Sequence, residues 1–474
     1  MVEMNEKNEN NRRELQDKRD IKNLSKLLRN GRIVGRANFI FTPELAAEIG
    51  VVHGSMFNVN ESIVFGRDFH SDSRMLKRGY SSGFMSTGTN LLNLSDCPFP
   101  LLQFTIRRFG AAGGIYFSGG HLYSEDVGIR LLDEQGIEIA QSEIQKFITL
   151  YNNYPKNIRR IDPGSIGRLT AIPQTKDIYL QSLQQFVKEK KIKNQDLKVV
   201  IDCSYGPAGN ITPLLLNEIG VDTIALNTHY RQRENPVPNV KTIRNTADIV
   251  TASNSHLGVC FDVDGSRLTV IDENGLEISF EDLLMLFIAY DDIIGNSEGN
   301  PILTTPAIST VVKRFIEERG HPIITVHNDP GNISRGINEH RAAFGASDTL
   351  KFYFPEFSPF SDGNFILLKL LKIMTEQNDL LSSLIRGFPK GSKVNKTIPV
   401  STELLNKLHN RLREKFKDYQ YSDIINELKI IDDGVWCTIK ASLKREAILL
   451  SAESDDIDKA RDLLAEVETQ IKEI

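Results

Sequence analysis

Residues 101–121 read LLQFTIRRFGAAGGIYFSGGH, and this stretch decides the fold class. The segment 101–109 has the spacing of an amphipathic helix, and residues 114–117 form a short apolar run that leads into a glycine-rich loop. A helix, a strand and then a glycine loop make up the repeating unit of a parallel α/β sheet. In such sheets ligands bind at the carboxyl ends of the strands, so the loop after residue 117 is the first place to look for chemistry.

The same alternation recurs along the chain. Thr42-Pro43-Glu44 is a helix start, with a capping Thr, a Pro at the first helical position and an acid in the first turn. Further strands are expected at 61–65, 90–94, 197–202, 222–226, 258–262, 302–304 and 323–326, with helices between them. From about residue 390 the composition changes, and a helix at 404–415, a hairpin about 432–434, strands at 435–440 and 447–451 and a final helix at 455–471 predict a smaller α+β domain.

Length and composition limit the class of protein. A chain of 474 residues is too long for one core, and its 40% hydrophobic and 25% charged residues are those of a globular protein without bilayer-spanning runs. The net charge of −5 gives no field that would attract nucleic acid or an anionic membrane. The cysteines at 97, 203, 260 and 437 have no metal-type spacing and indicate reduced, buried thiols, so a cytoplasmic protein is expected. Residues 1–30 are a charged leader, partly disordered, with a short helix near 21–29.

The chain resembles the α-D-phosphohexomutase superfamily, the phosphomannomutases and phosphoglucomutases, from about residue 31 to its end. The resemblance is carried by FTPELAAEIG (41–50), LLQFTIRRFGAAGGI (101–115), FDVDGSRLTVIDENG (261–275) and FPEFSPFSDGNFILLKLL (354–371). It implies three tandem mutase-type βα domains, with mixed or parallel sheets around a central cleft, and a smaller C-terminal α+β domain. The expected domains are 31–155, 156–272, 273–388 and 389–474. Within the superfamily the chain is most similar to the mutase-like module fused to sugar nucleotidyltransferases.

Such enzymes transfer a phosphoryl group between the 1- and 6-positions of a hexose phosphate through a phosphoserine in a Thr-Ala-Ser-His-Asn-Pro loop. The aligned residues here are 118–123, SGGHLY, so that Gly120 stands where the serine would be and His121 is retained. A glycine cannot carry a phosphoryl group. Ser118 is a hydroxyl two residues away, and a shift of that size misplaces an in-line attack. We therefore favour loop residues in a remodelled site over Ser118 or His121 as nucleophile.

The metal loop of the family presents three alternate aspartates before an arginine. Here the residues are Asp262, Asp264, Ser266 and Arg267. Two carboxylates and a hydroxyl would hold Mg²⁺ only weakly, because one formal charge is missing and no phosphoserine oxygen completes the shell. The alternative is that the two aspartates cap the turn and pair with Arg267.

The remaining ligand loops also depart from the family pattern. In the sugar loop, 345–351, the expected glutamate and histidine are altered and Asp348 is the nearest substitute. The phosphate loop is 440–446, KASLKRE, without its usual glycine. The cations and hydroxyl that could still hold an anion there are Lys440, Ser442, Lys444 and Arg445. Arg67 is a retained arginine after the strand at 61–65, whereas His70 stands where a second arginine is expected.

The pattern favours a catalytically inactive member of the superfamily, retained in carbohydrate metabolism for phosphosugar binding, regulation or assembly, because the scaffold segments match while all four loops differ. Two alternatives remain open. One is an active hexose-phosphate mutase with a non-standard nucleophile. The other is a structural partner of a sugar nucleotidyltransferase. A segment at 251–256, TASNSH, imitates the phosphoserine motif, but it lies at an expected helix end, where capping explains it.

Overall fold

The computed structural model describes most of the chain, in two compact units. The described residues are 24–29, 31–119, 126–187, 192, 195–230, 238–306, 308–327, 329–390, 392–399, 411–412, 414–415, 420–424, 427–432, 435–442, 447–454 and 456–473. Unit 1 contains the chain up to Ile278 together with Asp329–His340 and Thr349–Leu384, and unit 2 contains Ser279–Asn328, Arg341–Asp348 and Ile385–Ile474.

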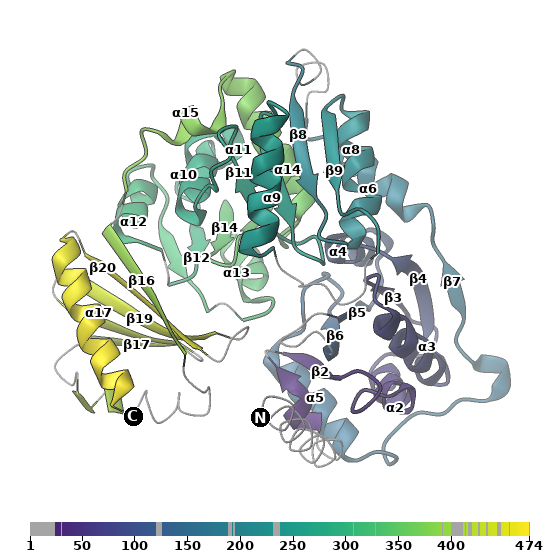
Figure 1. Ribbon diagram of the computed structural model, residues 1–474. Coiled ribbons are helices and arrows are strands. Elements are labelled where there is room, and N and C mark those ends of the chain that lie inside the picture. Colours follow the sequence, from purple (N-terminus) through teal and green to yellow (C-terminus); the bar gives the residue numbers. More distant parts are fainter. Residues whose placement is uncertain are drawn as a thin grey trace, which may run out of the picture. The chain divides into compact units, whose positions relative to one another are not determined.

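The first sheet of unit 1 has seven strands in the order β1-β2-β6-β5-β3-β4-β7 (Figure 1). Its strands are β1 (Leu28–Arg29), β2 (Arg32–Arg36), β3 (Ser62–Arg67), β4 (Asn90–Asp96), β5 (Gly113–Gly119), β6 (Asp126–Leu132) and β7 (Leu169–Ala171). Strand β3 pairs in parallel with β4 and β5, while β6 returns antiparallel to β5, the central strand. The sheet is therefore mixed, and the carboxyl ends of β3 and β5 lie together at one edge.

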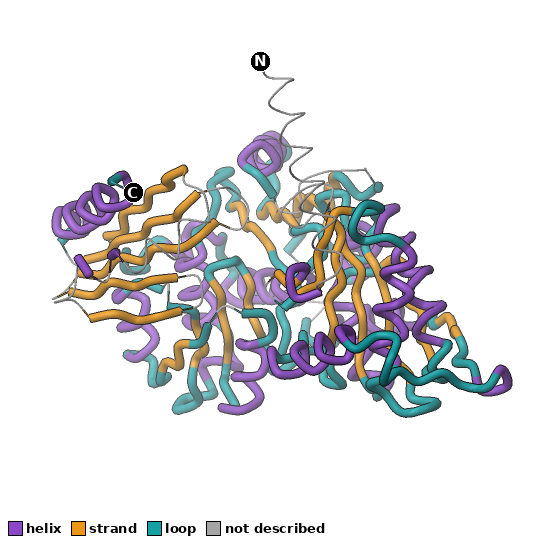
Figure 2. The backbone as a smooth tube through the Cα atoms, turned by 90° about the horizontal axis from the view of Figure 1, so that it is seen from below, coloured by secondary structure: helices purple, strands orange, loops and turns teal. Residues whose placement is uncertain are grey.

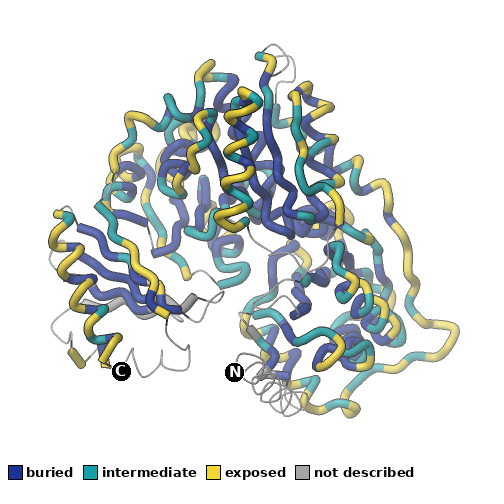
Figure 3. Tube along the Cα trace, in the orientation of Figure 1, coloured by how far each residue is buried: buried dark blue, intermediate teal, exposed yellow. Residues whose placement is uncertain are grey.

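Helices cover this sheet because its strands alternate between two apolar faces. Ile115 and Phe117 of β5 belong to one core with helices α2 (Pro43–Gly54) and α3 (Ser71–Met85). The Tyr116 ring, on the other face, lies 5.1 Å from the Phe99 ring of α4 (Phe99–Phe109). Helices α5 (Gln141–Asn152) and α6 (Thr175–Gln184) follow later in the chain. The strands β2, β3, β5 and β6 are mostly buried, whereas β4 is partly buried and β7 is exposed (Figure 3).

The helix start predicted at Thr42-Pro43 is confirmed. The Thr42 hydroxyl accepts a hydrogen bond from the Leu45 backbone N–H at 3.3 Å, and α2 begins at Pro43. The helix expected near 21–29 is wrong: the described residues form a 3-10 turn, η1 (Leu24–Leu27), followed by β1, which pairs with β2. Leu24 and Leu27 enter the core, so that tertiary pairing outweighs local helix propensity.

The second sheet of unit 1 has the order β11-β10-β8-β9. Its strands are β8 (Lys198–Asp202), β9 (Asp222–Leu226), β10 (Leu257–Phe261) and β11 (Leu268–Ile271), with helices α8 (Thr212–Glu218) and α9 (Val240–Ala252). Strands β8, β9 and β10 are parallel, and β11 returns antiparallel after the loop that begins at Asp262. The imitation motif at 251–256 lies at the end of α9, where Ser253 is the C-cap, as expected. Unit 1 also contains α13 (Asn332–His340), β15 (Lys351–Tyr353), α14 (Gly363–Gln377) and most of α15 (Leu381–Ile385).

Unit 2 contains three strands that pair in parallel and an antiparallel sheet. Figure 2 draws the strands in orange. Of the three parallel strands, β12 (Ile302–Thr304) pairs with both β13 (Ile323–Thr325) and β14 (Phe344–Ser347). Helices α10 (Phe280–Tyr290), α11 (Asp292–Gly295) and α12 (Thr310–Glu317) accompany it. The antiparallel sheet has the order β16-β20-β19-β18-β17 and packs against α17 (Ile457–Lys472).

The C-terminal strands are β16 (Ser392–Pro399), β17 (Gln420–Ile424), β18 (Glu427–Asp432), β19 (Val435–Ser442) and β20 (Ala447–Ser454). The smaller α+β domain predicted from the composition change is confirmed by this sheet and α17. Most of the helix expected at 404–415 lies outside the described residues. All four cysteines are free and buried.

Candidate functional site

The metal loop is held together by hydrogen bonds to its two aspartates. The Asp262 carboxylate accepts the backbone N–H groups of Ser266 at 2.9 Å and Arg267 at 3.2 Å on Oδ1. Oδ1 of Asp264 accepts the same Ser266 N–H at 3.0 Å. Gly265, with φ of 76°, makes the tight turn between Asp264 and Ser266. Both carboxylates are thus fixed by the backbone that follows them.

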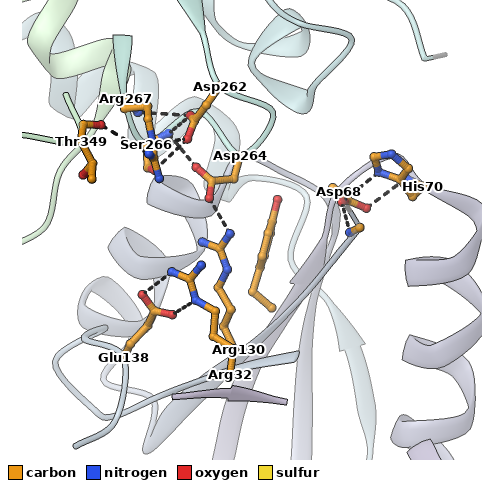
Figure 4. A network of polar contacts seen from close by, with 12 residues as sticks. Arg32, Asp68, His70, Arg130, Glu138, Asp262, Asp264, Ser266, Arg267 and Thr349 are labelled. Atoms are coloured by element: carbon orange, nitrogen blue, oxygen red, sulfur yellow. Dashed lines mark hydrogen bonds and ion pairs between the residues drawn. The ribbon is translucent and has the colours of Figure 1, made fainter. Parts of the chain in front are cut away.

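Each of the two carboxylates also has an arginine partner (Figure 4). Nε of Arg267 lies 2.7 Å from Oδ2 of Asp262, and Nη2 of Arg130 lies 2.7 Å from Oδ2 of Asp264. The pairing of Asp262 with Arg267 is the alternative that the sequence left open. The pairing of Asp264 with Arg130, which lies on β6, was not predicted.

These charges set the proton affinities of the loop. Burial raises the pKa of Asp262 to about 6, and the nearby Asp264 adds to the shift although Arg267 opposes it. Burial alone would also raise the pKa of Asp264, but Arg130, Lys351 and Arg267 outweigh burial and hold it well below its usual range. The two aspartates therefore differ: Asp264 is firmly ionised, and Asp262 titrates near neutrality.

A second ion pair lies beside this loop. Arg32 of β2 donates from Nε and Nη2 to the two oxygens of Glu138, at 2.7 and 3.0 Å. Burial would raise the pKa of Glu138, yet Arg32 and Arg130 bring it down to about 2. Lys351, at the start of β15, is half-buried, and burial together with the charge of Arg267 lowers its pKa to about 8. Four cations and three carboxylates thus share one region of unit 1.

Asp68 joins the carboxyl ends of β3 and β5. Its fully buried carboxylate accepts the Gly119 backbone N–H at 2.6 Å, the His70 backbone N–H at 3.0 Å and His70 Nδ1 at 3.0 Å. Burial opposes ionisation, but the hydrogen bond and charge of His70 lower the pKa of Asp68, and the same contacts raise the pKa of His70. A side chain on Gly119 would approach the His70 ring to 3.0 Å. His70 therefore packs directly against the entry to the loop that contains Gly120.

Ser118 is a strand residue in the structure. It lies in β5 opposite Gly128 of β6, and it is 3% exposed. Gly120 and His121 lie outside the described residues. The hydroxyl that sequence spacing offered as a displaced nucleophile is therefore buried in a paired strand rather than presented on a loop.

Arg67 does not present a free guanidinium. It is 7% exposed, forms an ion pair with Asp96 and donates to the Asp68 carbonyl oxygen at 2.7 Å. Asp348, in unit 2, lies just after β14, where its Oδ1 accepts a hydrogen bond from the Thr305 hydroxyl at 3.3 Å. Lys440 and Ser442 fall within β19, and Lys444 and Arg445 lie outside the described residues. Arg67 and Asp348 thus have structural partners, and roles in ligand binding for these residues stay predictions.

The arrangement at the metal loop does not fit Mg²⁺. Mg²⁺ requires oxygen ligands at about 2.1 Å in octahedral geometry and keeps several waters. The Asp262 and Asp264 oxygens are already used by backbone N–H groups and by two guanidinium groups, which would repel a divalent cation. Among the residues that the structure describes, no cluster of three or more His, Cys, Asp or Glu side chains could hold a metal ion.

Sequence reasoning missed the residues that complete this region, namely Arg32, Arg130, Glu138 and Lys351. Little in the sequence points to Arg130 as a buried residue. An arginine in a largely apolar strand, DVGIRLL, is expected to be exposed, because the carboxylate that pairs with it is distant in the sequence.

Comparisons with known proteins place the chain in a family. Sequence models of the phosphoglucomutase/phosphomannomutase α/β/α domains I, II and III match residues 26–157, 177–275 and 281–391. Because these matches cover most of the chain in the family's domain order, the chain belongs to the phosphoglucomutase/phosphomannomutase family of α-D-phosphohexomutases.

Individual relatives agree with this placement. A phosphoglucomutase/phosphomannomutase of Thermococcus kodakarensis is 28% identical over 451 residues, covering 93% of this chain and 97% of that protein. A crystal structure of a family protein from Burkholderia thailandensis has a TM-score of 0.79 at 19% identity, covering 93% and 96% of the two chains. The Aspergillus fumigatus N-acetylphosphoglucosamine mutase, solved with GlcNAc-6P and magnesium, has a TM-score of 0.52 at 13% identity, covering 86% and 82%. No helix among the described residues is both long and apolar enough to cross a membrane.

Proposed function

We propose that this chain binds a phosphosugar without transferring its phosphoryl group, and that it serves carbohydrate metabolism by binding, regulation or assembly. The observation that carries the proposal is the double arginine pairing of the metal loop, in which Arg130 and Arg267 neutralise Asp264 and Asp262. Phosphoryl transfer needs a positioned nucleophile and a cation that neutralises developing charge. Both parts of that machinery are altered here.

The nucleophile supports the same proposal. Gly120 stands at the phosphoserine position, and Ser118 is a buried residue of β5. To attack a phosphoryl group, the Ser118 hydroxyl would have to leave its strand, with loss of the pairing to Gly128. Misplacement of a reacting group by about 1 Å already costs about 100-fold in rate.

The ligand class follows from the family and from the cations that remain. The fungal relative named above binds GlcNAc-6P, and we expect a hexose phosphate for this chain. The positive charge of Arg267 lowers the pKa of Lys351, so the two cations repel each other electrostatically. An anion between them would relieve their repulsion, so these two cations are the proposed phosphate contacts in unit 1. We propose 31–155, 156–272, 273–388 and 389–474 as the domains, and a cytoplasmic location.

The test is phosphorylation itself. The purified protein is incubated with a hexose 1,6-bisphosphate and Mg²⁺, and its intact mass is measured. We expect no mass increase of one phosphoryl group for the wild type, and none for Gly120→Ser, because the carboxylates of the metal loop stay paired with arginines in that variant. A relative with an intact phosphoserine loop is the positive control. A stable phosphoprotein from the wild type would overturn the proposal.

Ligand binding is measured separately, by a thermal-shift screen of hexose phosphates with and without Mg²⁺. A ligand that binds only the folded chain must raise its melting temperature. We expect a shift with at least one hexose phosphate, and a smaller one in Lys351→Met. A chain that responds to none of them would contradict phosphosugar binding and would leave assembly as its role.

The names of the relatives favour a second candidate, an active mutase with a non-standard nucleophile. It predicts a phosphoprotein in the mass experiment that disappears in Ser118→Ala or His121→Ala. Partnership with a sugar nucleotidyltransferase stays a prediction, for which co-purification from the native source is the test.

A further inference from the structure

We propose that Arg130 and Arg267 together replace the divalent cation of the metal loop, so that this loop binds no metal ion unless one of the two arginines is removed. The inference concerns the loop itself and does not depend on whether a phosphosugar binds. It goes beyond the loss of the nucleophile, because it assigns a specific role to Arg130 of β6, a residue that the sequence analysis did not single out.

The charges of the loop balance without a metal. Asp262 and Asp264 contribute two negative charges, and each is matched by one guanidinium at 2.7 Å. Ser266 stands at the third position of the loop, where it contributes a backbone N–H to both carboxylates rather than a further negative charge. A third carboxylate at this point would add a negative charge beyond the two that the guanidinium groups neutralise. The serine at 266 and the two arginine–aspartate pairs therefore act together to keep the loop electrically neutral.

The surroundings of Arg130 hold its guanidinium in place. The side chains of Arg130 and Asp264 are 7% and 8% exposed. The guanidinium lies 4.6 Å from the centre of the Phe99 ring and 5.7 Å from that of Tyr116, the residue directly opposite it on β5. Aromatic faces attract a weakly hydrated guanidinium, whereas Mg²⁺ gives up its water reluctantly. This environment selects an arginine over a metal ion.

Asp264 is the ion-pair partner of Arg130, and the guanidinium is further attracted by Glu138, whose pKa it lowers, and by two aromatic rings. Among the described residues the Nε and Nη1 atoms of Arg130 are buried without a hydrogen-bond partner. A buried charge that lacks its counter-ion is strongly unfavourable, so Asp264 and Arg130 depend on each other. Removal of Arg130 would free Oδ2 of Asp264 from its guanidinium partner. A carboxylate oxygen that has lost its buried counter-ion is a ligand that a hard divalent cation prefers.

The experiment compares Arg130→Met with Arg32→Met in the full-length chain. Arg32 is the matched control, because it also forms an arginine–carboxylate pair in the same unit, with Glu138 rather than with an aspartate of the loop. Melting temperatures are measured in EDTA and in millimolar Mg²⁺, and Mn²⁺ binding is followed by its electron paramagnetic resonance signal.

We expect the wild type to show no stoichiometric Mn²⁺ binding and no Mg²⁺-dependent shift. Both variants should melt lower than the wild type in EDTA. Arg130→Met should regain about 2–4 °C in Mg²⁺ at about ten times its dissociation constant and bind one Mn²⁺, whereas Arg32→Met should not respond.

Stoichiometric Mn²⁺ binding by the wild type, displaced by Mg²⁺, would overturn the proposal whatever the variants do. A folded Arg130→Met variant that binds no Mn²⁺ and has the same melting temperature with and without Mg²⁺ would overturn the proposal as well. If Arg130→Met does not fold, Arg267→Met takes its place, because the more exposed Arg267 side chain (22%) can be removed at lower cost and its loss frees Asp262. Failure of this proposal leaves the phosphorylation result above unchanged, so the two are separately testable.

Discussion

Acid should destabilise unit 1 through one buried histidine. His53 of α2 is 3% exposed, and its Nδ1 lies 2.6 Å from the Tyr80 hydroxyl on α3. The rings of Phe57 and Phe84 approach it to 5.0 and 5.8 Å. Burial lowers the pKa of His53 from 6.5 to about 3, since an imidazolium has no water or anion to stabilise it there.

The sign and size of the effect follow from linkage. Because the folded pKa is depressed, the unfolded chain binds a proton below pH 6.5 while the folded chain does not, so stability falls as the pH drops from 6.5 toward 3. Each pH unit costs about 1.4 kcal/mol. At pH 4 the free energy of unfolding of unit 1 is therefore lower by about 3 kcal/mol, which raises its equilibrium constant for opening roughly 300-fold.

Hydrogen exchange of the α2 peptide, corrected for intrinsic rates, measures this opening in unit 1 alone. The variant His53→Gln cannot take up the proton, so its loss of protection between pH 7 and pH 4 should be smaller than that of the wild type by about 3 kcal/mol. Tyr80→Phe is the matched control: it removes the hydrogen bond, costs about 1 kcal/mol at both pH values and keeps the slope. Equal slopes for the wild type and His53→Gln would refute the reasoning.

Two further outcomes follow from the same unit. Asp68→Asn should lower the free energy of unfolding of unit 1 at pH 7 by about 2–4 kcal/mol, because it weakens three hydrogen bonds to a buried carboxylate. The measurement is urea unfolding, in which the control Asp222→Asn, at an exposed position, should change little. Since the pKa of Asp68 is lowered in the folded chain, the stability difference between the wild type and Asp68→Asn should shrink as the pH falls through that lowered pKa. A stability difference that grows in acid would contradict this prediction. Gly83→Ala should cost about 1–3 kcal/mol or more, because its Cβ would come within 1.9 Å of the Ala47 carbonyl oxygen where α3 crosses α2. The exposed Ser82→Ala on the same helix should melt like the wild type, and a Gly83→Ala variant that does so too would show that the helices can separate.

The α/β architecture could be read from local pattern. The alternation of apolar strands and amphipathic helices predicted β9 and β12 with their observed bounds, and the cap at Thr42 predicted the start of α2. These features depend on neighbours within a few residues, which is the range over which side-chain periodicity and capping act. The turn at 24–29 was predicted wrongly because its conformation depends on pairing with β2 and on burial of Leu24 and Leu27 in the core of the first sheet.

The sequence by itself determined the family of folds, and it placed Asp262 and Asp264 directly after a strand, where β10 ends at Phe261. Only the tertiary structure decided what those residues face. Arg130 reaches Asp264 because the fold of unit 1 brings the loop after β10 of the second sheet against β6 of the first, and Asp68 meets Gly119 because β3 and β5 are neighbours. Electrostatic interactions act through space, so the partner of a buried charge cannot be inferred from spacing along the chain.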